Sequence, residues 1–208
     1  MRPVTPAPRT DGFTLVEAMV VVAVLAVLLG VAVPAMSNLV LARKAAAAAA
    51  FYKEGLALAR SQAIAHNSAS RLVLLDNANG QMDWRVDLCF PAATACSDSS
   101  GSWSTVSAAA DGDPAKPGGF RSLLRGAGAM PPSSVMRVTV TPQEQDAVYF
   151  TPLGWVDTRV ATRIARIALA PAAGAAGFPE RAVVLTLAGV ASICDPAAPA
   201  HGARACPP

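Results

Sequence analysis

The side chains that most often carry out catalysis are few and scattered in this chain of 208 residues. There are two histidines, His66 and His201, and neither has a nucleophile or a carboxylate as partner in a recognisable motif. Asp83 and Asp87 have the spacing of one helix face, but the surrounding residues predict a strand, so we expect solvated carboxylates rather than a catalytic pair. The motifs of phosphate-binding loops, serine hydrolases and zinc proteases are absent. The sequence therefore predicts neither an enzyme nor a cofactor site.

The four cysteines form two groups that are close in the sequence. Cys89 and Cys96 are seven residues apart, and Cys194 and Cys206 are twelve apart. In an exported domain they predict disulfides, for which three pairings are possible. We favour the two local pairs over free buried thiols. Each disulfide would close a short loop and stabilise the fold by about 2–3 kcal/mol. Paired spacings such as Cys-x₂-Cys are absent, so no metal site is expected.

An uncharged apolar run dominates the first part of the chain. The chain is 53% apolar and only 15% charged, whereas soluble domains carry about 25% charged residues. No charged side chain occurs from Ala18 to Ala42. About 20 apolar residues span a bilayer as a helix, while a signal peptide, the alternative, has an apolar region of only ~7–15 residues. We therefore expect a membrane-spanning helix, with Glu17 just inside it either at headgroup level or paired with a positive charge.

The charge balance by itself does not indicate a dedicated nucleic-acid binder. Seventeen basic against fourteen acidic residues leave a net charge of only +3. Arg159, Arg163 and Arg166 form a basic cluster, but phosphate contacts usually need several cations on one surface. We interpret the cluster as a solvated strand face, and DNA is not expected among the partners.

The helix is predicted to continue beyond the apolar run, from about Phe13 to His66. Six consecutive alanines favour this continuation, because alanine is the best helix former. Phe51, Leu58 and Ala65 recur every seven residues and predict an amphipathic second half. An amphipathic half-helix needs a surface against which to pack.

Short apolar runs separated by turn signals follow the helix and predict six or so strands. No second helical region is evident, so we predict an α+β fold in which an antiparallel β-sheet domain packs on the amphipathic half-helix. Residues 97–128, rich in Gly, Ser, Ala and Asp, are predicted to be a long irregular loop. The runs are residues 71–75, 84–90, 135–140, 147–150, 166–169, 181–187 and 190–194.

The segment Gly12-Phe13-Thr14-Leu15-Val16-Glu17, behind a short basic leader, resembles the processing motif of type IV prepilins and type II secretion pseudopilins. The resemblance implies that a prepilin peptidase cuts between Gly12 and Phe13 and methylates the new amino terminus at Phe13. It also implies that Glu17 neutralises the amino terminus of a neighbouring subunit, since opposite charges in an apolar setting must pair. Pro34 lies where many pilins carry a proline that kinks the helix.

Three later segments are similar to the GspH/FimT group of this family. They are residues 58–67 at the end of the helix, the Phe150–Gly154 segment, and the Leu187–Gly189 turn before the last strand. The resemblance implies a minor pseudopilin of a type II secretion system or, alternatively, a minor type IV pilin for pilus assembly or DNA uptake. FimT-like DNA binders carry a Gly-Arg-x-Arg motif near the last strand, whereas residues 189–192 here read Gly-Val-Ala-Ser.

The resemblance also implies how the chain is divided and where it is located. It predicts a leader at 1–12, a transmembrane and assembly half-helix at 13–43, an amphipathic half-helix at 44–66 and a periplasmic β domain at 67–208. The chain would cross the inner membrane once, with a cytoplasmic N-terminus before processing. The implied partners are other pilin or pseudopilin subunits, the prepilin peptidase/methyltransferase and the inner-membrane assembly platform.

Overall fold

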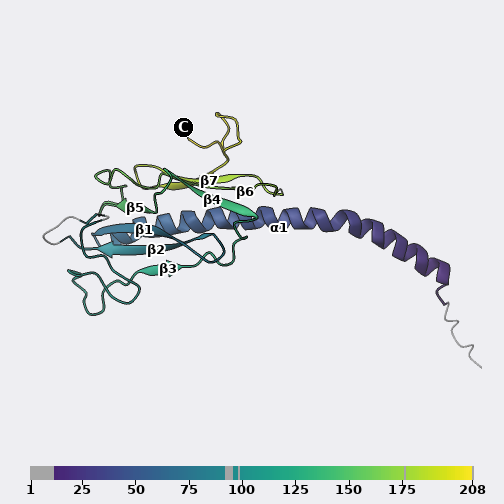
Figure 1. Ribbon diagram of the computed structural model, residues 1–208, viewed down its shortest axis with the longest axis horizontal. Helices are drawn as coiled ribbons and strands as arrows, with labels where there is room; N and C mark the ends of the chain where they lie inside the picture. The colour runs from purple at the N-terminus through teal and green to yellow at the C-terminus, as the bar shows by residue number, and fades with distance from the viewer. Residues whose placement is uncertain (1–11, 92–95, 98, 176, 208) are drawn as a thin grey trace, which may run out of the picture. The chain divides into compact units, whose positions relative to one another are not determined.

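A computed structural model describes residues 12–91, 96–97, 99–175 and 177–207. Among these residues, one helix, α1 (Leu15–Ala65), is followed by eight strands (Figure 1). The chain divides into two compact units, the first ending at Asn38 and the second beginning at Leu39. The boundary therefore falls inside α1, and the second unit holds all the strands.

Helix α1 ends where local backbone chemistry stops it. Asn67 adopts φ 45°, a left-handed conformation that asparagine tolerates better than most residues. The Ser68 N–H donates to the Ala63 carbonyl at 3.1 Å, and the Asn67 N–H donates to the Ile64 carbonyl at 3.2 Å. This pair of bonds is a Schellman motif, which satisfies carbonyls that the last turn would leave unpaired.

The strands form two antiparallel four-stranded sheets. The first has the order β3-β2-β1-β5 and the second β4-β6-β7-β8. In β4, Met136, Val138 and Val140 are buried and the residues between them are exposed, as the two-residue period of a strand requires. The strands are β1 (Ala69–Asp76), β2 (Met82–Cys89), β3 (Leu123–Arg125), β4 (Met136–Thr141), β5 (Ala147–Phe150), β6 (Arg166–Pro171), β7 (Arg181–Leu185) and β8 (Ala191–Cys194).

The α+β class, a long N-terminal helix packed on antiparallel sheet, is confirmed, but the predicted loop at 97–128 is wrong in one place. That region contains β3, which pairs with β2 through Leu123, Leu124 and Arg125. All three residues of β3 are exposed, so the strand has no alternation of buried and exposed side chains that a sequence pattern could reveal. Its neighbour, rather than its own composition, makes it a strand.

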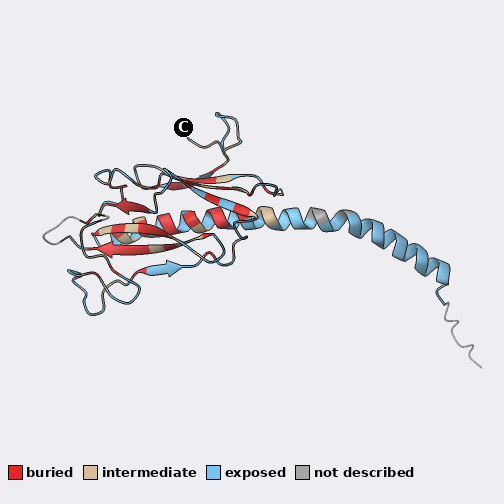
Figure 2. Cartoon of the chain, viewed as in Figure 1, coloured by how far each residue is buried: buried red, intermediate tan, exposed pale blue. Residues whose placement is uncertain are grey.

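One core joins the second half of α1 to both sheets (Figure 2). The buried helix face contains Tyr52 and Leu56 among small residues, and it meets Leu72 and Trp84 of the first sheet and Ile167 of the second. The buried helix positions are Ala45, Ala48, Ala49, Tyr52, Gly55, Leu56, Ala59 and Ala63.

The predicted stripe of Phe51, Leu58 and Ala65 lies at the margin of this face. Phe51 and Leu58 are only partly buried, and Ala65 is exposed. The predicted stripe was therefore centred on the wrong positions, because the closest helix–sheet contact requires small side chains rather than large ones.

Asp87 is not the solvated carboxylate that was predicted. Its side chain is fully buried and accepts hydrogen bonds from Arg71 Nε at 2.9 Å and from Arg85 Nε at 2.7 Å. Asp83, half-buried, accepts the side-chain amide of Asn77 and the backbone N–H of Ala127, each at 2.7 Å. Buried carboxylates require such partners. Those of Asp87 come from β1 and from its own strand, and those of Asp83 come from loop residues.

We predict that Gly55→Ala destabilises the domain, although alanine is the better helix former. A Cβ at Gly55 would lie 2.8 Å from Leu72 Cδ1 and 2.9 Å from Trp84 Cδ2, inside a packed core. Overpacking of this kind costs about 1–3 kcal/mol, which exceeds the gain of about 1 kcal/mol in helix propensity. Urea unfolding of a fragment beginning at Leu39 measures the difference.

The Ala57→Gly variant, at an exposed position, measures the effect of helix propensity in the same helix. Its free energy of unfolding should fall by about 1 kcal/mol. A Gly55→Ala protein more stable than the wild type would contradict the proposed helix–sheet contact.

Candidate functional site

The expected cleavage point lies in non-helical chain just before α1. Phe13 is 83% exposed, and a Cβ added to Gly12 would meet no atom within 4 Å. Neither residue therefore contributes to the packing of the described chain. A requirement for glycine at position 12 would reflect recognition by another protein rather than folding.

Thr14 and Glu17 form the beginning of α1. The Thr14 hydroxyl accepts the Glu17 N–H at 3.3 Å, and the Thr14 carbonyl accepts the Ala18 N–H at 3.2 Å. Thr14 is therefore the N-cap, and Glu17 occupies the third helical position, where a carboxylate favourably meets the positive end of the helix dipole. No described residue forms an ion pair with Glu17, which is exposed. The sequence analysis missed the cap, although Thr-x-x-Glu is its usual signature.

Large apolar side chains from Phe13 to Val40 are exposed on all sides of the helix (Figure 2). Among them are Leu15, Met19, Leu25 and Leu29. Exposed apolar surface on this scale marks a surface that other molecules cover.

Within the described part of the chain, no helix meets the length and hydropathy expected of a membrane span.

The bend predicted at Pro34 stays a prediction. Pro34 belongs to α1, and its side chain lies outside the described residues.

The three segments that resemble the GspH/FimT group meet in space at the end of α1. Arg60 Nε donates to the Gly154 carbonyl at 3.1 Å, and the Val156 N–H donates to the Leu187 carbonyl at 3.0 Å. Gly189, with φ 77°, approaches so closely that a Cβ there would overlap the Gly154 carbonyl oxygen. Residues far apart in the sequence thus form one junction, which we call the helix-end junction: Arg60, Gly154 and Gly189.

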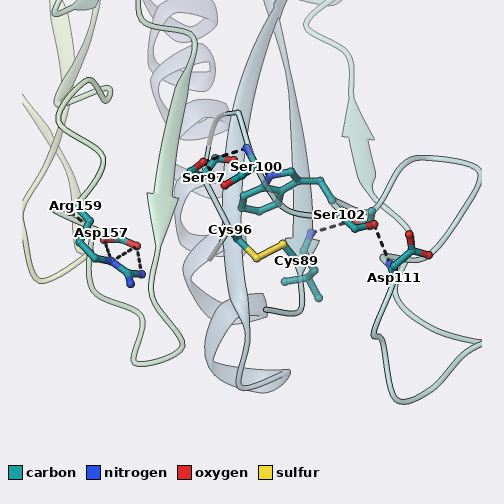
Figure 3. The surroundings of a disulfide bond; sticks show 11 residues. Cys89, Cys96, Ser97, Ser100, Ser102, Asp111, Asp157 and Arg159 are labelled. Carbon is teal, nitrogen blue, oxygen red and sulfur yellow. Dashed lines mark hydrogen bonds and ion pairs between the residues drawn. A yellow bond between two sulfur atoms is a disulfide. The ribbon is translucent and has the colours of Figure 1, made fainter. Parts of the chain in front are cut away.

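The basic cluster is not a free cationic surface. Arg159 is paired with Asp157 through several hydrogen bonds, including Nε to Oδ1 at 2.9 Å (Figure 3). Arg163 donates to the carbonyls of Val160 and Ala161, and Arg166 is half-buried in β6. The hydrogen bonds from Arg159 hold the pKa of the Asp157 carboxyl below its ordinary value. This neutralisation weakens any attraction for phosphate.

The cysteines are joined as Cys89–Cys96 and Cys194–Cys206. The first disulfide closes the loop that follows β2 (Figure 3). Trp103 in the next segment donates its indole N–H to the Ser97 carbonyl at 2.9 Å. The Arg71 guanidinium lies 4.3 Å from the centre of the Trp103 ring. Trp103 thus lies over the Arg71 side chain that is paired with Asp87.

No group of three or more metal-ligating side chains is found among the residues that the structure describes. His66 lies at the end of α1 against the rings of Phe90 and Phe120, with centroids 6.5 and 5.4 Å away. These ring contacts are packing, and they give His66 no catalytic partner.

Comparison with known families finds two matches. Residues 8–33 match the family described as prokaryotic N-terminal methylation motif, and residues 48–189 match the family described as type II transport protein GspH. The second match contains the whole helix-end junction. No curated protein and no solved structure matches the chain.

We predict that Gly189→Ala destabilises the protein far more than Gly174→Ala. Both glycines have a positive φ, 77° and 80°, but a Cβ at Gly174 would meet nothing within 4 Å. The backbone conformation alone costs about 1–2 kcal/mol for alanine, and the overlap with the Gly154 carbonyl adds to it only at Gly189. Urea unfolding of both variants separates the two effects; equal losses would contradict the close backbone approach.

We predict that Asp157 stabilises the domain at neutral pH and not in acid. Because its folded-state pKa is lowered, its contribution is present above the ordinary pKa of about 3.9 and is lost as the pH falls through the folded-state value. Asp157→Asn should therefore lower the free energy of unfolding by about 1 kcal/mol at pH ~7, and by progressively less as the pH falls below about 4. Unfolding measured across this range tests the prediction.

Glu180→Gln is the control, because Glu180 is exposed and pairs with no described residue. A difference between wild type and Asp157→Asn that stays constant with pH would rule out the ion pair as its cause.

Proposed function

Because the chain belongs to the GspH family of type II transport proteins, we propose that it is a minor pseudopilin, a structural subunit of a type II secretion pseudopilus. The family consists of structural pilin-like subunits rather than enzymes. The chain also carries the N-terminal methylation motif that precedes assembly of such subunits. Its action is then assembly into a fibre and not turnover of a substrate.

One observation carries the proposal: the β domain has a complete core, while the helix that precedes it exposes apolar side chains on every side. The core includes the helix from Ala45 onward and both sheets. The exposed side chains begin at Phe13, immediately after the proposed cleavage point. A segment of this kind is suited first to lipid and then to the matching helices of other subunits, and we propose that residues 13–43 anchor the chain in the inner membrane before assembly.

Processing supplies a positively charged partner for Glu17. Cleavage after Gly12 leaves an amine on Phe13 that the positive end of the helix dipole disfavours. In an apolar environment that amine needs a negative partner, and Glu17 is exposed in the first turn of α1. We propose that the Glu17 of one subunit pairs with the methylated amine of its neighbour.

The remaining partners and the location follow from the same proposal. The prepilin peptidase/methyltransferase acts on the cytoplasmic side, the inner-membrane platform drives assembly, and residues 67–208 lie in the periplasm. A minor type IV pilin would share this architecture. DNA uptake has less support, because Arg159 is paired with Asp157 and residues 189–192 lack the two arginines.

The mature chain should begin at an N-methylated Phe13. Intact-mass measurement of protein extracted from cells with an active prepilin peptidase tests this, and Gly12→Phe should leave the precursor uncleaved. Because a side chain at position 12 touches nothing in the described chain, the variant should still form both disulfides.

Gly30→Ala is the matched control, since a Cβ there also meets nothing, and it should be processed normally. A mature protein that retains Met1 would refute the assignment as a pseudopilin. Recovery of processed chain only in type IV pili would favour the pilin alternative.

A further inference from the structure

Five large apolar side chains are exposed around the helix-end junction. Leu153 is 75% exposed, Trp155 61% and Leu187 59%, while Ile64 and Val190 are each 49% exposed. We call these five residues the junction patch. None of them carries a charge, and they lie on the helix end and on the two turns that the helix-end junction brings together.

Backbone contacts place the five residues side by side. The Val156 N–H, next to Trp155, bonds to the Leu187 carbonyl at 3.0 Å. A Cβ at Gly154, next to Leu153, would lie 2.6 Å from Ile64 Cδ1. Ile64 and Val190 also line one shallow hollow of about 180 Å³. The five residues therefore lie together around the helix end, where Arg60 lines the same hollow as Ile64 and Val190.

The patch is held rigidly. The turn that carries Leu153 and Trp155 is closed by the Thr151 N–H donating to the Trp155 carbonyl at 2.8 Å, and Arg60 ties its Gly154 carbonyl to α1. The second turn is closed by the Thr186 N–H donating to the Val190 carbonyl at 3.0 Å. A preformed surface loses little conformational entropy on binding, and tryptophan is enriched among the residues that dominate binding energy.

The size of the patch favours a protein partner. It exposes on the order of 500 Å² of apolar surface, near the upper limit for a monomer and most of the ~800 Å² that one partner buries in a stable interface. The hollow of about 180 Å³ is smaller than ligand pockets of about 300–1,000 Å³. Ile64 is 22 residues beyond the end of the uncharged run at Ala42, about 33 Å along the helix, too far for the patch to meet the membrane from which that run would emerge.

We infer that the junction patch is the surface through which the β domain packs on a neighbouring pilin-like subunit. The inference rests on the proposed function and is continuous with it: packing of apolar half-helices brings neighbouring β domains together, and the patch flanks the exposed side of the same helix at Ala57 and Ser61. The occupant is an apolar surface of another subunit, and its contact adds to the pairing at Glu17.

The test uses the full chain in cells that assemble the fibre. A photoreactive benzoylphenylalanine replaces Leu153, and the same group at Val106, an equally apolar residue that is 55% exposed outside the patch, is the control. After irradiation, mass spectrometry should identify a cross-link from position 153 to a chain that carries an N-terminal methylation motif. Position 106 should give none. Cross-links from 153 only to lipid or to a secreted protein, or none at all, overturn the inference.

Arginine substitutions supply the second arm. Trp155→Arg and Leu187→Arg should each reduce recovery in sheared fibres at least tenfold, whereas Val106→Arg should not. Thermal unfolding of the extracted variants, which alter exposed side chains, verifies that each is folded. Recovery of both patch variants at the wild-type level overturns the inference while leaving the proposed function intact.

Glu17→Ala separates the two proposals. If the wild-type chain is absent from fibres, as the Glu17→Ala variant is expected to be, the proposed function fails. The cross-link then decides the patch alone: a methylation-motif partner at position 153 supports it, and its absence overturns it.

Discussion

The close approach of α1 to the two sheets is the contact on which the rest of the molecule depends. Between Ala45 and Ala63 the buried helix positions are mostly alanine, and Gly55 lies where Leu72 and Trp84 come closest. Small side chains let the sheets contact the helix backbone directly, so the second half of α1 becomes the centre of the core rather than a cover over it. The β domain is complete without the first half, and that half is left free for other partners.

One continuous helix therefore serves two environments. Its second half is fixed by packing, whereas the first exposes valine, leucine and methionine on all sides. Thr14 begins the helix and leaves Glu17 in its first turn, where the helix dipole favours a carboxylate. In the proposed assembly, this acidic residue, which would be costly within lipid, is the charge that meets the amine of another subunit.

The residues of the helix-end junction hold separate backbone segments together. Gly189 leaves room for the Gly154 carbonyl, and Arg60 donates to that carbonyl from the helix. The contact positions two turns whose apolar side chains face outward. Structure and assembly are linked here, since the bonds that hold the turns also hold the surface that we assign to a neighbouring subunit.

The sequence by itself determined the features that depend on neighbours a few residues away. It contains the uncharged run and the processing motif, and it predicts the end of the helix near Asn67, the two local disulfides and most strands. Each of these is a matter of composition, period or short loops. Only the tertiary structure decided that β3 is a strand, that Asp87 is buried and paired with Arg71 of the neighbouring strand, and that Arg60 meets Gly154 across 94 residues. These features depend on which distant backbone lies opposite, and no local pattern carries that information.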